Sequence, residues 1–253
     1  MKRIGEFYVG YQAKAPAGIA LGIKLLLASL LCLVVVVALV LSASQAPLGA
    51  GKFEFRNYRE FTGIILAEPY PRLLVERPGE TPDQSSYSSW LLVAPFKFGA
   101  DELIAGHVGE KVTLQGALIY RDGQTMLELL PDSISTAKPP APFAGRPAEV
   151  LGQVRLNGEI VDSKCYLGVM KPGNAKTHRA CAVRCISGGV PPLLVVRTPA
   201  GNRSYYQLVD VNGAPVNQRI LDKIAVPVQI SGELVRYDDT LVLKAPPESY
   251  TLL

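Results

Sequence analysis

The chain has 253 residues, of which 48% are hydrophobic, and its mean hydropathy is positive at +0.20. These values are too apolar for an ordinary soluble protein of this length, so we expect one strongly hydrophobic segment beside a folded region. The net charge of +4 is small and spread along the chain, and it gives no support to a role in binding nucleic acid.

The apolar excess lies in one segment near the N-terminus. From Leu25 to Leu41 the chain has no charged residue, and with the residues back to Gly18 the apolar run reaches the ~20 residues that cross a bilayer. A cleaved signal peptide is the alternative, because small residues follow the run. The run is longer than the usual ~7 to 15 residues of a signal, however, and its polar leader is long. We therefore predict an uncleaved signal anchor with a transmembrane helix over residues 18–42, in which Cys32 faces lipid or packs without a chemical role.

Basic residues flank the predicted helix on both sides, with a thin excess on the N-terminal side. They are Lys2, Arg3, Lys14 and Lys24 on one side and Lys52, Arg56 and Arg59 on the other. The positive-inside rule then favours a cytoplasmic tail at residues 1–17, followed after the membrane by a juxtamembrane link at residues 43–58. The predicted location is the plasma (inner) membrane, crossed once, with the C-terminal domains periplasmic or extracellular.

Two stretches with the same order of elements follow the link, at residues 59–135 and 151–253. Each indicates about five strands, with a short helix between the third and the fourth. The closing hairpins agree best, because KVTLQGALIYRDGQT aligns with VPVQISGELVRYDDT, with Gly116 on Gly232 and Asp122 on Asp238. Residues 136–150 are rich in proline and alanine, and we predict a semi-rigid linker there.

This order, with a glycine in the first and fourth strands, resembles the OB-fold, a five-stranded Greek-key barrel. We therefore predict a mainly β protein, in which an N-terminal transmembrane helix is followed by two tandem five-stranded OB-like barrels, the second with a Cys/His-bearing helical insertion. The layout resembles the periplasmic haem chaperones of cytochrome c maturation, which join a membrane anchor to an OB-fold. Neither His107 nor His178 is followed by tyrosine in the His-x-x-x-Tyr pattern of that family. The resemblance therefore implies the architecture and not haem binding.

The second repeat differs from the first by an insertion of roughly 25 residues between its first two strands, within residues 162–189. The insertion holds three of the four cysteines and one of the two histidines, namely Cys165, His178, Cys181 and Cys185. The stretch THRACAVRCI predicts a short helix with Thr177 as its N-cap and Gly188 and Gly189 at its end. On that helix the histidine and the last two cysteines, at i, i+3 and i+7, share one face. A loop around Pro172 lets the first cysteine fold back toward them.

Three interpretations of this cluster stay open. Thiolates and an imidazole are ligands of zinc, copper(I) and iron–sulfur clusters, so a Cys3His metal site is one. Cysteines in an oxidising compartment usually form disulfides, so a bond from Cys165 to Cys181 or Cys185 is another, although it leaves one thiol over. A reactive redox thiol is the third, because the neighbouring basic residues would lower a thiol pKa. These basic residues are Lys164, Arg179 and Arg184.

The sequence favours a non-catalytic role. We expect an extracytoplasmic accessory, assembly or redox/metal-handling subunit of a membrane complex, with the membrane and a protein of that complex as partners. One alternative is a thiol–disulfide oxidoreductase that acts through Cys181 or Cys185. Another is an oligosaccharide-binding or single-strand-binding OB module, which needs Trp90, Tyr205 or Tyr206 exposed as a stacking surface.

Overall fold

A computed structural model describes residues 15–45, 51–77, 86–136 and 148–253. The chain forms two compact units, Met1–Pro47 and Leu48–Leu253. The predicted tail at residues 1–17, link at 43–58 and linker at 136–150 fall partly or largely outside the described residues. Both predicted barrels lie in the second unit.

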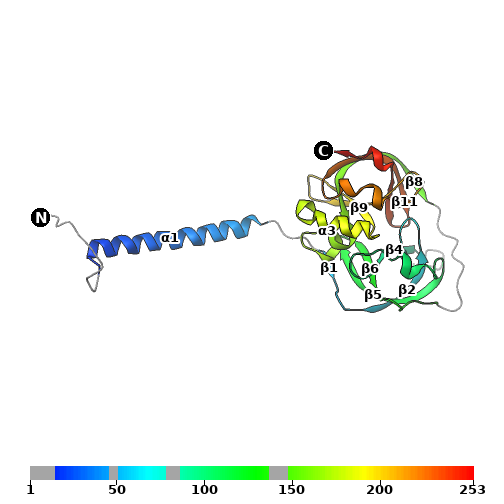
Figure 1. Cartoon of the computed structure of the whole chain (residues 1–253), viewed down its shortest axis with the longest axis horizontal. Helices are drawn as coiled ribbons and strands as arrows, with labels where there is room; N and C mark the ends of the chain where they lie inside the picture. Colours follow the sequence, from blue (N-terminus) through cyan, green and yellow to red (C-terminus); the bar gives the residue numbers. More distant parts are fainter. Residues whose placement is uncertain (1–14, 46–50, 78–85, 137–147) are drawn as a thin grey trace. The chain divides into compact units, whose positions relative to one another are not determined.

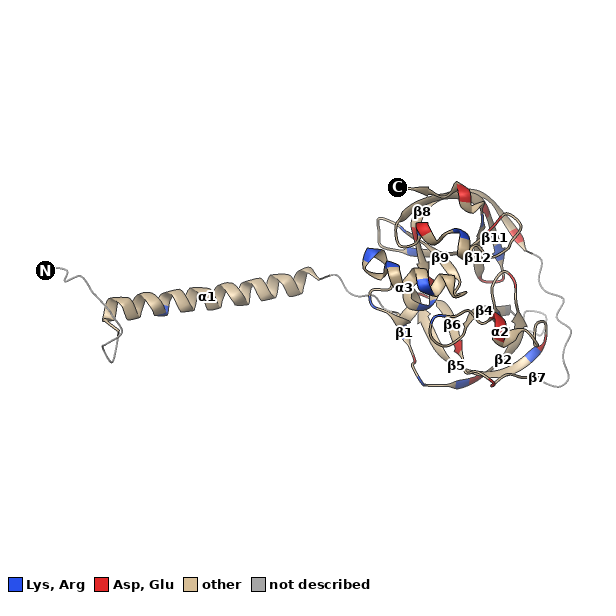
Figure 2. Ribbon diagram, in the orientation of Figure 1, with Lys and Arg blue, Asp and Glu red and all other residues tan. Residues whose placement is uncertain are grey.

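Helix α1 (Ala17–Ser44) is the main element of the first unit. Its 28 residues span about 42 Å at 1.5 Å per residue, which exceeds the ~30 Å of a bilayer's hydrocarbon core. Figure 2 shows α1 almost without charge, whereas charged residues of both signs are scattered over the second unit. The predicted apolar helix is thus confirmed, and it is long and apolar enough to cross a membrane. The same composition also fits a signal sequence.

The second unit begins with β1 (Lys52–Phe53) and continues into the first barrel. The barrel strands are β2 (Arg59–Leu66), β3 (Arg72–Arg77), β4 (Ser86–Val93), β5 (Lys111–Arg121) and β6 (Gln124–Leu129). Helix α2 (Asp101–Ile104) separates β4 from β5, and β1 and the short β7 (Ser135–Thr136) pair with β5. Strand β5 pairs with both β2 and β6, and β4 pairs in parallel with β6, so the sheet closes on itself.

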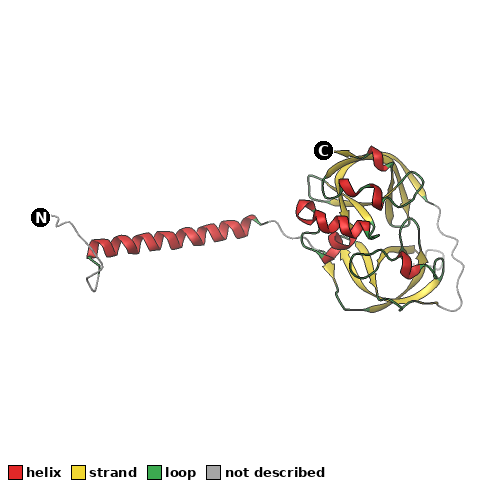
Figure 3. Ribbon diagram, in the orientation of Figure 1, coloured by secondary structure: helices red, strands yellow, loops and turns green. Residues whose placement is uncertain are grey.

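The second barrel repeats this topology. Its strands are β8 (Glu149–Asp162), β9 (Pro192–Arg197), β10 (Arg203–Val209), β11 (Pro227–Tyr237) and β12 (Thr240–Lys244). Two 3-10 turns, η3 (Asn217–Arg219) and η4 (Leu221–Lys223), replace α2, and η5 (Pro247–Ser249) and β13 (Thr251–Leu252) follow β12. Strand β11 pairs with β8 and β12, and β10 pairs in parallel with β12. The predicted mainly β fold with two closed five-stranded OB-like barrels is confirmed (Figure 3).

Glycine occupies the fourth strand of each barrel for the same steric reason. A Cβ on Gly116 would collide with the backbone oxygen of Glu128, and a Cβ on Gly232 would collide with that of Lys244. These two carbonyls lie at equivalent places in β6 and β12, and both come too close to the glycine for a side chain to fit. The agreement of the two hairpins in sequence therefore reflects one shared backbone geometry.

The two barrels pack against each other through a hydrophobic cluster that is distinct from the core inside each barrel. Each barrel has an internal cluster, and a third cluster takes residues from both, among them Leu91 and Met126 of the first barrel and Val195 and Val242 of the second. The closing turns reinforce this contact reciprocally. Asp122 accepts hydrogen bonds from β10, and Asp239 accepts one from the Ser89 amide on β4 at 3.0 Å.

The insertion folds into two helical elements between β8 and β9, and Figure 1 shows α3 beside both barrels. They are the π-helical turn η2 (Cys165–Val169), which the sequence did not indicate, and α3 (Ala175–Ser187). The prediction of Thr177 as N-cap is wrong, because the N-cap is Asn174, three residues earlier, and α3 begins at Ala175. The Glu159 carboxylate on β8 accepts the Ala175 amide there and fixes the start of the helix. The predicted end at Gly188 is confirmed.

Candidate metal centre

The structure brings the four predicted ligands together in two overlapping groups. Metal-ligating atoms of Cys165, His178 and Cys181 lie within 4.8 Å of one another, and so do those of Asp162, Cys165 and Cys185. Cys165, at the start of η2, belongs to both groups, while the other three predicted ligands share one side of α3. The residues therefore converge, but around a shared thiol and with an additional carboxylate.

The sulfur atoms lie at a separation that suits a shared metal ion. Cys165 Sγ is 4.0 Å from Cys181 Sγ and 4.0 Å from Cys185 Sγ. Two thiolates bound tetrahedrally to one zinc, at Zn–S distances of ~2.3 Å, stand about 3.8 Å apart. A disulfide requires about 2.05 Å. All four cysteines are free thiols in this structure, so neither of the two predicted disulfide pairings is formed.

Asp162 contacts two of the four predicted ligands, Cys165 and His178. It is fully buried at the end of β8; its Oδ1 accepts the amide of Cys165 at 2.7 Å, and its Oδ2 lies 3.0 Å from His178 Nε2. When Nε2 donates its proton to this carboxylate, the neutral ring carries its lone pair on Nδ1, which is then the nitrogen available to a metal. A carboxylate on the second nitrogen is the usual partner of a metal-binding histidine. The sequence analysis missed this role, although Asp162 opens the insertion.

A lysine from the other barrel supplies the positive charge at the thiols. Lys97, in the loop between β4 and α2, places its Nζ 2.7 Å from Cys181 Sγ and 3.9 Å from Cys185 Sγ. The hydrogen bond to Cys181 raises the pKa of Lys97, so its ammonium form is stabilised. The contact could not be predicted from sequence spacing, because Lys97 and Cys181 are 84 positions apart.

The three basic residues named from the sequence act elsewhere. Lys164 is buried and binds the first barrel, with its Nζ 2.6 Å from Glu128 Oε2. Arg179 donates to the backbone oxygen of Asp222 at 2.8 Å, and Arg184 is exposed. The prediction that they surround the thiols is therefore corrected: Lys97 takes that place.

The buried thiols influence each other's protonation. The contact with Cys185, followed by burial and the charge of Asp162, raises the pKa of Cys165. The same contact, with help from the Lys97 ammonium, lowers the pKa of Cys185. Cys185 therefore ionises before Cys165, and a cation at this place would release the remaining proton.

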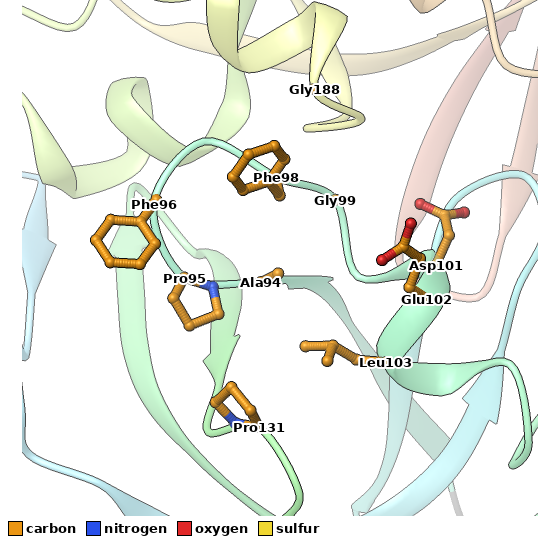
Figure 4. Close-up of a pocket in the computed structure, with 10 residues that line it drawn as sticks. All are labelled: Ala94, Pro95, Phe96, Phe98, Gly99, Asp101, Glu102, Leu103, Pro131 and Gly188. Carbon is orange, nitrogen blue, oxygen red and sulfur yellow. The ribbon is translucent and has the colours of Figure 1, made fainter.

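The loop that carries Lys97 also borders an apolar cavity of about 500 Å³. Figure 4 shows the rings of Phe96 and Phe98 on this loop, with Leu103 and Pro131 below them. Phe96 is 83% exposed, and the loop contacts the end of α3 where the Gly99 amide donates to the Gly188 oxygen at 2.9 Å. Lys97 thus lies in sequence between two exposed phenylalanines, and its ammonium contacts the cysteine cluster.

The aromatic residues of the predicted stacking surface are engaged in packing. Tyr205 is only 8% exposed, and its hydroxyl donates to Asp122 Oδ2 at 2.6 Å. Tyr206 packs against the core of the second barrel, and Trp90 meets Phe61 edge to face at 5.4 Å. Tyr205 is therefore too buried for the stacking of a base or a sugar, whereas Trp90 and Tyr206 are partly exposed.

No protein-family model matches the chain, and no curated protein matches it at a significant level. The chemistry of the cluster is therefore inferred from its geometry. Its donor types, separations and burial suit a metal ion.

Proposed function

We propose that this protein is a membrane-anchored, extracytoplasmic accessory or assembly subunit of a membrane complex, and that its insertion holds one metal ion through Cys165, His178, Cys181 and Cys185. One observation carries the proposal. The sulfur of Cys165 stands 4.0 Å from each of the other two sulfurs, close to the spacing that one tetrahedral ion imposes and far from that of a disulfide. Binding of one ion by all four residues requires side-chain movements that bring Cys185 and His178 to the same ion.

Zinc fits the donor set and the local charge best. Three thiolates and a neutral imidazole around Zn²⁺ carry a net charge of about −1, which the ammonium of Lys97 offsets at 2.7 Å from Cys181. Copper(I) in the same site would leave a larger uncompensated negative charge. Iron–sulfur clusters generally take four cysteines, and the insertion supplies three.

The donor count indicates a role other than catalysis. A zinc ion with four protein ligands has no open position for water or substrate, which is typical of structural sites. Such an ion would order an insertion that contacts both barrels, and their outer surfaces would remain available to a partner. This favours an accessory subunit over a thiol–disulfide oxidoreductase, whose reactive thiols have to be free to exchange.

Metal analysis of the full-length protein tests the proposal. The chain is purified in detergent without chelator, its metal content is measured, and cobalt is then substituted to report thiolate ligation by its absorption spectrum. We expect about one zinc per chain, with loss of zinc in Cys165→Ser and Cys185→Ser. Cys32→Ser is the matched control, because Cys32 lies on α1, and it should keep the metal.

Two other outcomes would reject the metal site. Protein without stoichiometric metal, with two insertion cysteines oxidised and one free, would show a disulfide staple. Metal-free protein whose thiols exchange rapidly with a small disulfide would favour the oxidoreductase.

Membrane placement needs a separate experiment. A reporter that is active only outside the cytoplasm, fused after Leu253, should be active if α1 is an uncleaved anchor with its N-terminus inside. An intact mass that includes α1 would distinguish the anchor from a cleaved signal sequence.

A further inference from the structure

We propose that the metal centre is also an oxidation switch, in which Cys181 reacts first with a peroxide and Cys165 then forms a disulfide with it. The metal ion loses two of its ligands in this reaction and is released. The release step rests on the proposed function, whereas the order of the thiol chemistry stands on geometry alone.

Exposure distinguishes the three thiols. Cys165 and Cys185 are 4% and 1% exposed and belong to the core between the barrels. Cys181 is partly exposed and packs only against the edge of that core. A small oxidant from solvent therefore reaches Cys181 before it reaches the other two.

The ammonium of Lys97 lies beside the same sulfur, that of Cys181. Its ammonium lies 2.7 Å from Cys181 Sγ but 3.9 Å from Cys185 Sγ, so the positive charge acts chiefly on the accessible thiol. A cation hydrogen-bonded to this sulfur stabilises the negative charge that passes to oxygen when the O–O bond breaks. Lys97 acts through its hydrogen bond to the Cys181 sulfur and is a positioning residue.

Cys165 is the thiol placed to resolve the oxidised sulfur. It lies on η2, on a different segment from Cys181, and the two sulfurs are 4.0 Å apart. Cys185 follows Cys181 by one turn of α3 and shares neither close ligand group with it. A bond between Cys165 and Cys181 would link η2 to α3, whereas a bond within α3 would require the helix to distort.

The chemistry is balanced with a hydroperoxide as the only co-reactant. The Cys181 thiolate attacks the peroxide oxygen, the O–O bond breaks, and the leaving alkoxide or hydroxide takes up a proton. The product is a sulfenic acid on Cys181. The Cys165 sulfur then attacks that sulfur, an S–S bond forms, and water leaves. Two thiols are oxidised by two electrons, and one peroxide is reduced to an alcohol or water, with one further water formed.

The test treats zinc-loaded full-length protein with hydrogen peroxide below one equivalent. A sulfenic-acid trap and peptide mass spectrometry identify the first oxidised cysteine and the final disulfide, and a chromogenic chelator reports zinc. We expect the trap on Cys181, then a Cys165–Cys181 disulfide with release of about one zinc per disulfide formed. In Cys165→Ser the sulfenic acid should persist. Lys97→Gln should slow the first step roughly five- to tenfold, whereas Lys176→Gln, an exposed lysine on α3, should not.

Several results would overturn the switch. They are first trapping on Cys165 or Cys185, a disulfide within α3, or equal oxidation rates in the two lysine variants. Failure of the proposed function would look different. A protein that binds no metal but still shows trapping on Cys181 and the predicted disulfide would keep the thiol sequence and remove only zinc release.

Discussion

Replacing Lys164 by methionine should loosen the insertion from the first barrel. The Lys164 side chain is 2% exposed, yet its ammonium pairs with Glu128 at 2.6 Å and donates to the backbone oxygens of Ala94 and Phe96 at 2.8 Å each. Methionine preserves the apolar stem but removes every donor. Glu128, whose side chain is 9% exposed, then remains as a buried carboxylate without its partner.

The cost follows from that unpaired charge. Removing one member of a buried ion pair destabilises a protein by about 3–5 kcal/mol. For a folded unit of 150–250 residues, each kcal/mol lowers Tm by roughly 2–4 °C, so Lys164→Met should lower it by about 6–20 °C. Adding Glu128→Gln removes the stranded charge and should recover much of the loss.

Fluorescence of Trp90 measures this directly. Trp90 is the only tryptophan of the chain and lies on β4, just before the loop that Lys164 binds. Thermal unfolding of the full chain in detergent gives Tm, and Lys171→Met, an exposed lysine of the same insertion, should change it little. A shift below 2 °C for Lys164→Met, or a double variant no more stable than the single one, would refute the assigned role of the ion pair.

Three further predictions follow from the contacts between the elements. Asp162→Asn should weaken metal binding about 10- to 100-fold, because it removes the carboxylate that orients His178; competition with a chromogenic chelator measures this, and an unchanged dissociation constant would contradict it. Tyr70→Phe should lower the free energy of unfolding by about 1–3 kcal/mol in chemical denaturation, because the buried Tyr70 hydroxyl donates to a β10 carbonyl at 2.7 Å; a loss of a few tenths would argue against it. The hydrogen bond from Tyr205, aided by a neighbouring arginine, lowers the pKa of Asp122 in the folded state. That stabilisation is therefore present above the unfolded pKa of ~3.9 and is lost as pH falls through the lower folded value. Asp122→Asn should be less stable than wild type at pH 7, and the difference should shrink below about pH 4; a difference independent of pH would contradict this.

Local signals in the sequence were sufficient for the transmembrane-length helix and the barrel strands, but not for the π-helical turn η2. The uncharged run predicts α1, the alternating strands and matching hairpins predict the barrels, and the Asp122-Gly123 turn joins β5 to β6 as expected. Both turn residues adopt positive φ, 48° and 80°, a backbone that Asp and Gly tolerate. These features depend on residues close in sequence, where spacing alone carries the geometry.

The site was predictable only where its residues are neighbours in sequence. His178, Cys181 and Cys185 share a helix, so their common face could be read from spacing. Lys97 comes from another barrel, and no periodicity connects it to Cys181. The prediction of Thr177 as N-cap was wrong for a related reason. The first amide of α3 donates to the carboxylate of Glu159, which lies on β8 and not in the local sequence. Contacts made through tertiary packing decide these positions, and a local pattern does not contain them.

The metal centre belongs to the second barrel by sequence and to both barrels by structure. Lys97 reaches the thiols from the first barrel, while Lys164 of the insertion reaches back to that barrel. Cys165 and Cys185 are part of the core that joins the two. A ligand that binds only the folded state stabilises it by RT ln(1 + [L]/Kd), about 4 kcal/mol at a thousand times Kd. A metal ion bound at this place would therefore strengthen the contact between the barrels, and oxidation of Cys181 would weaken that contact as it released the ion.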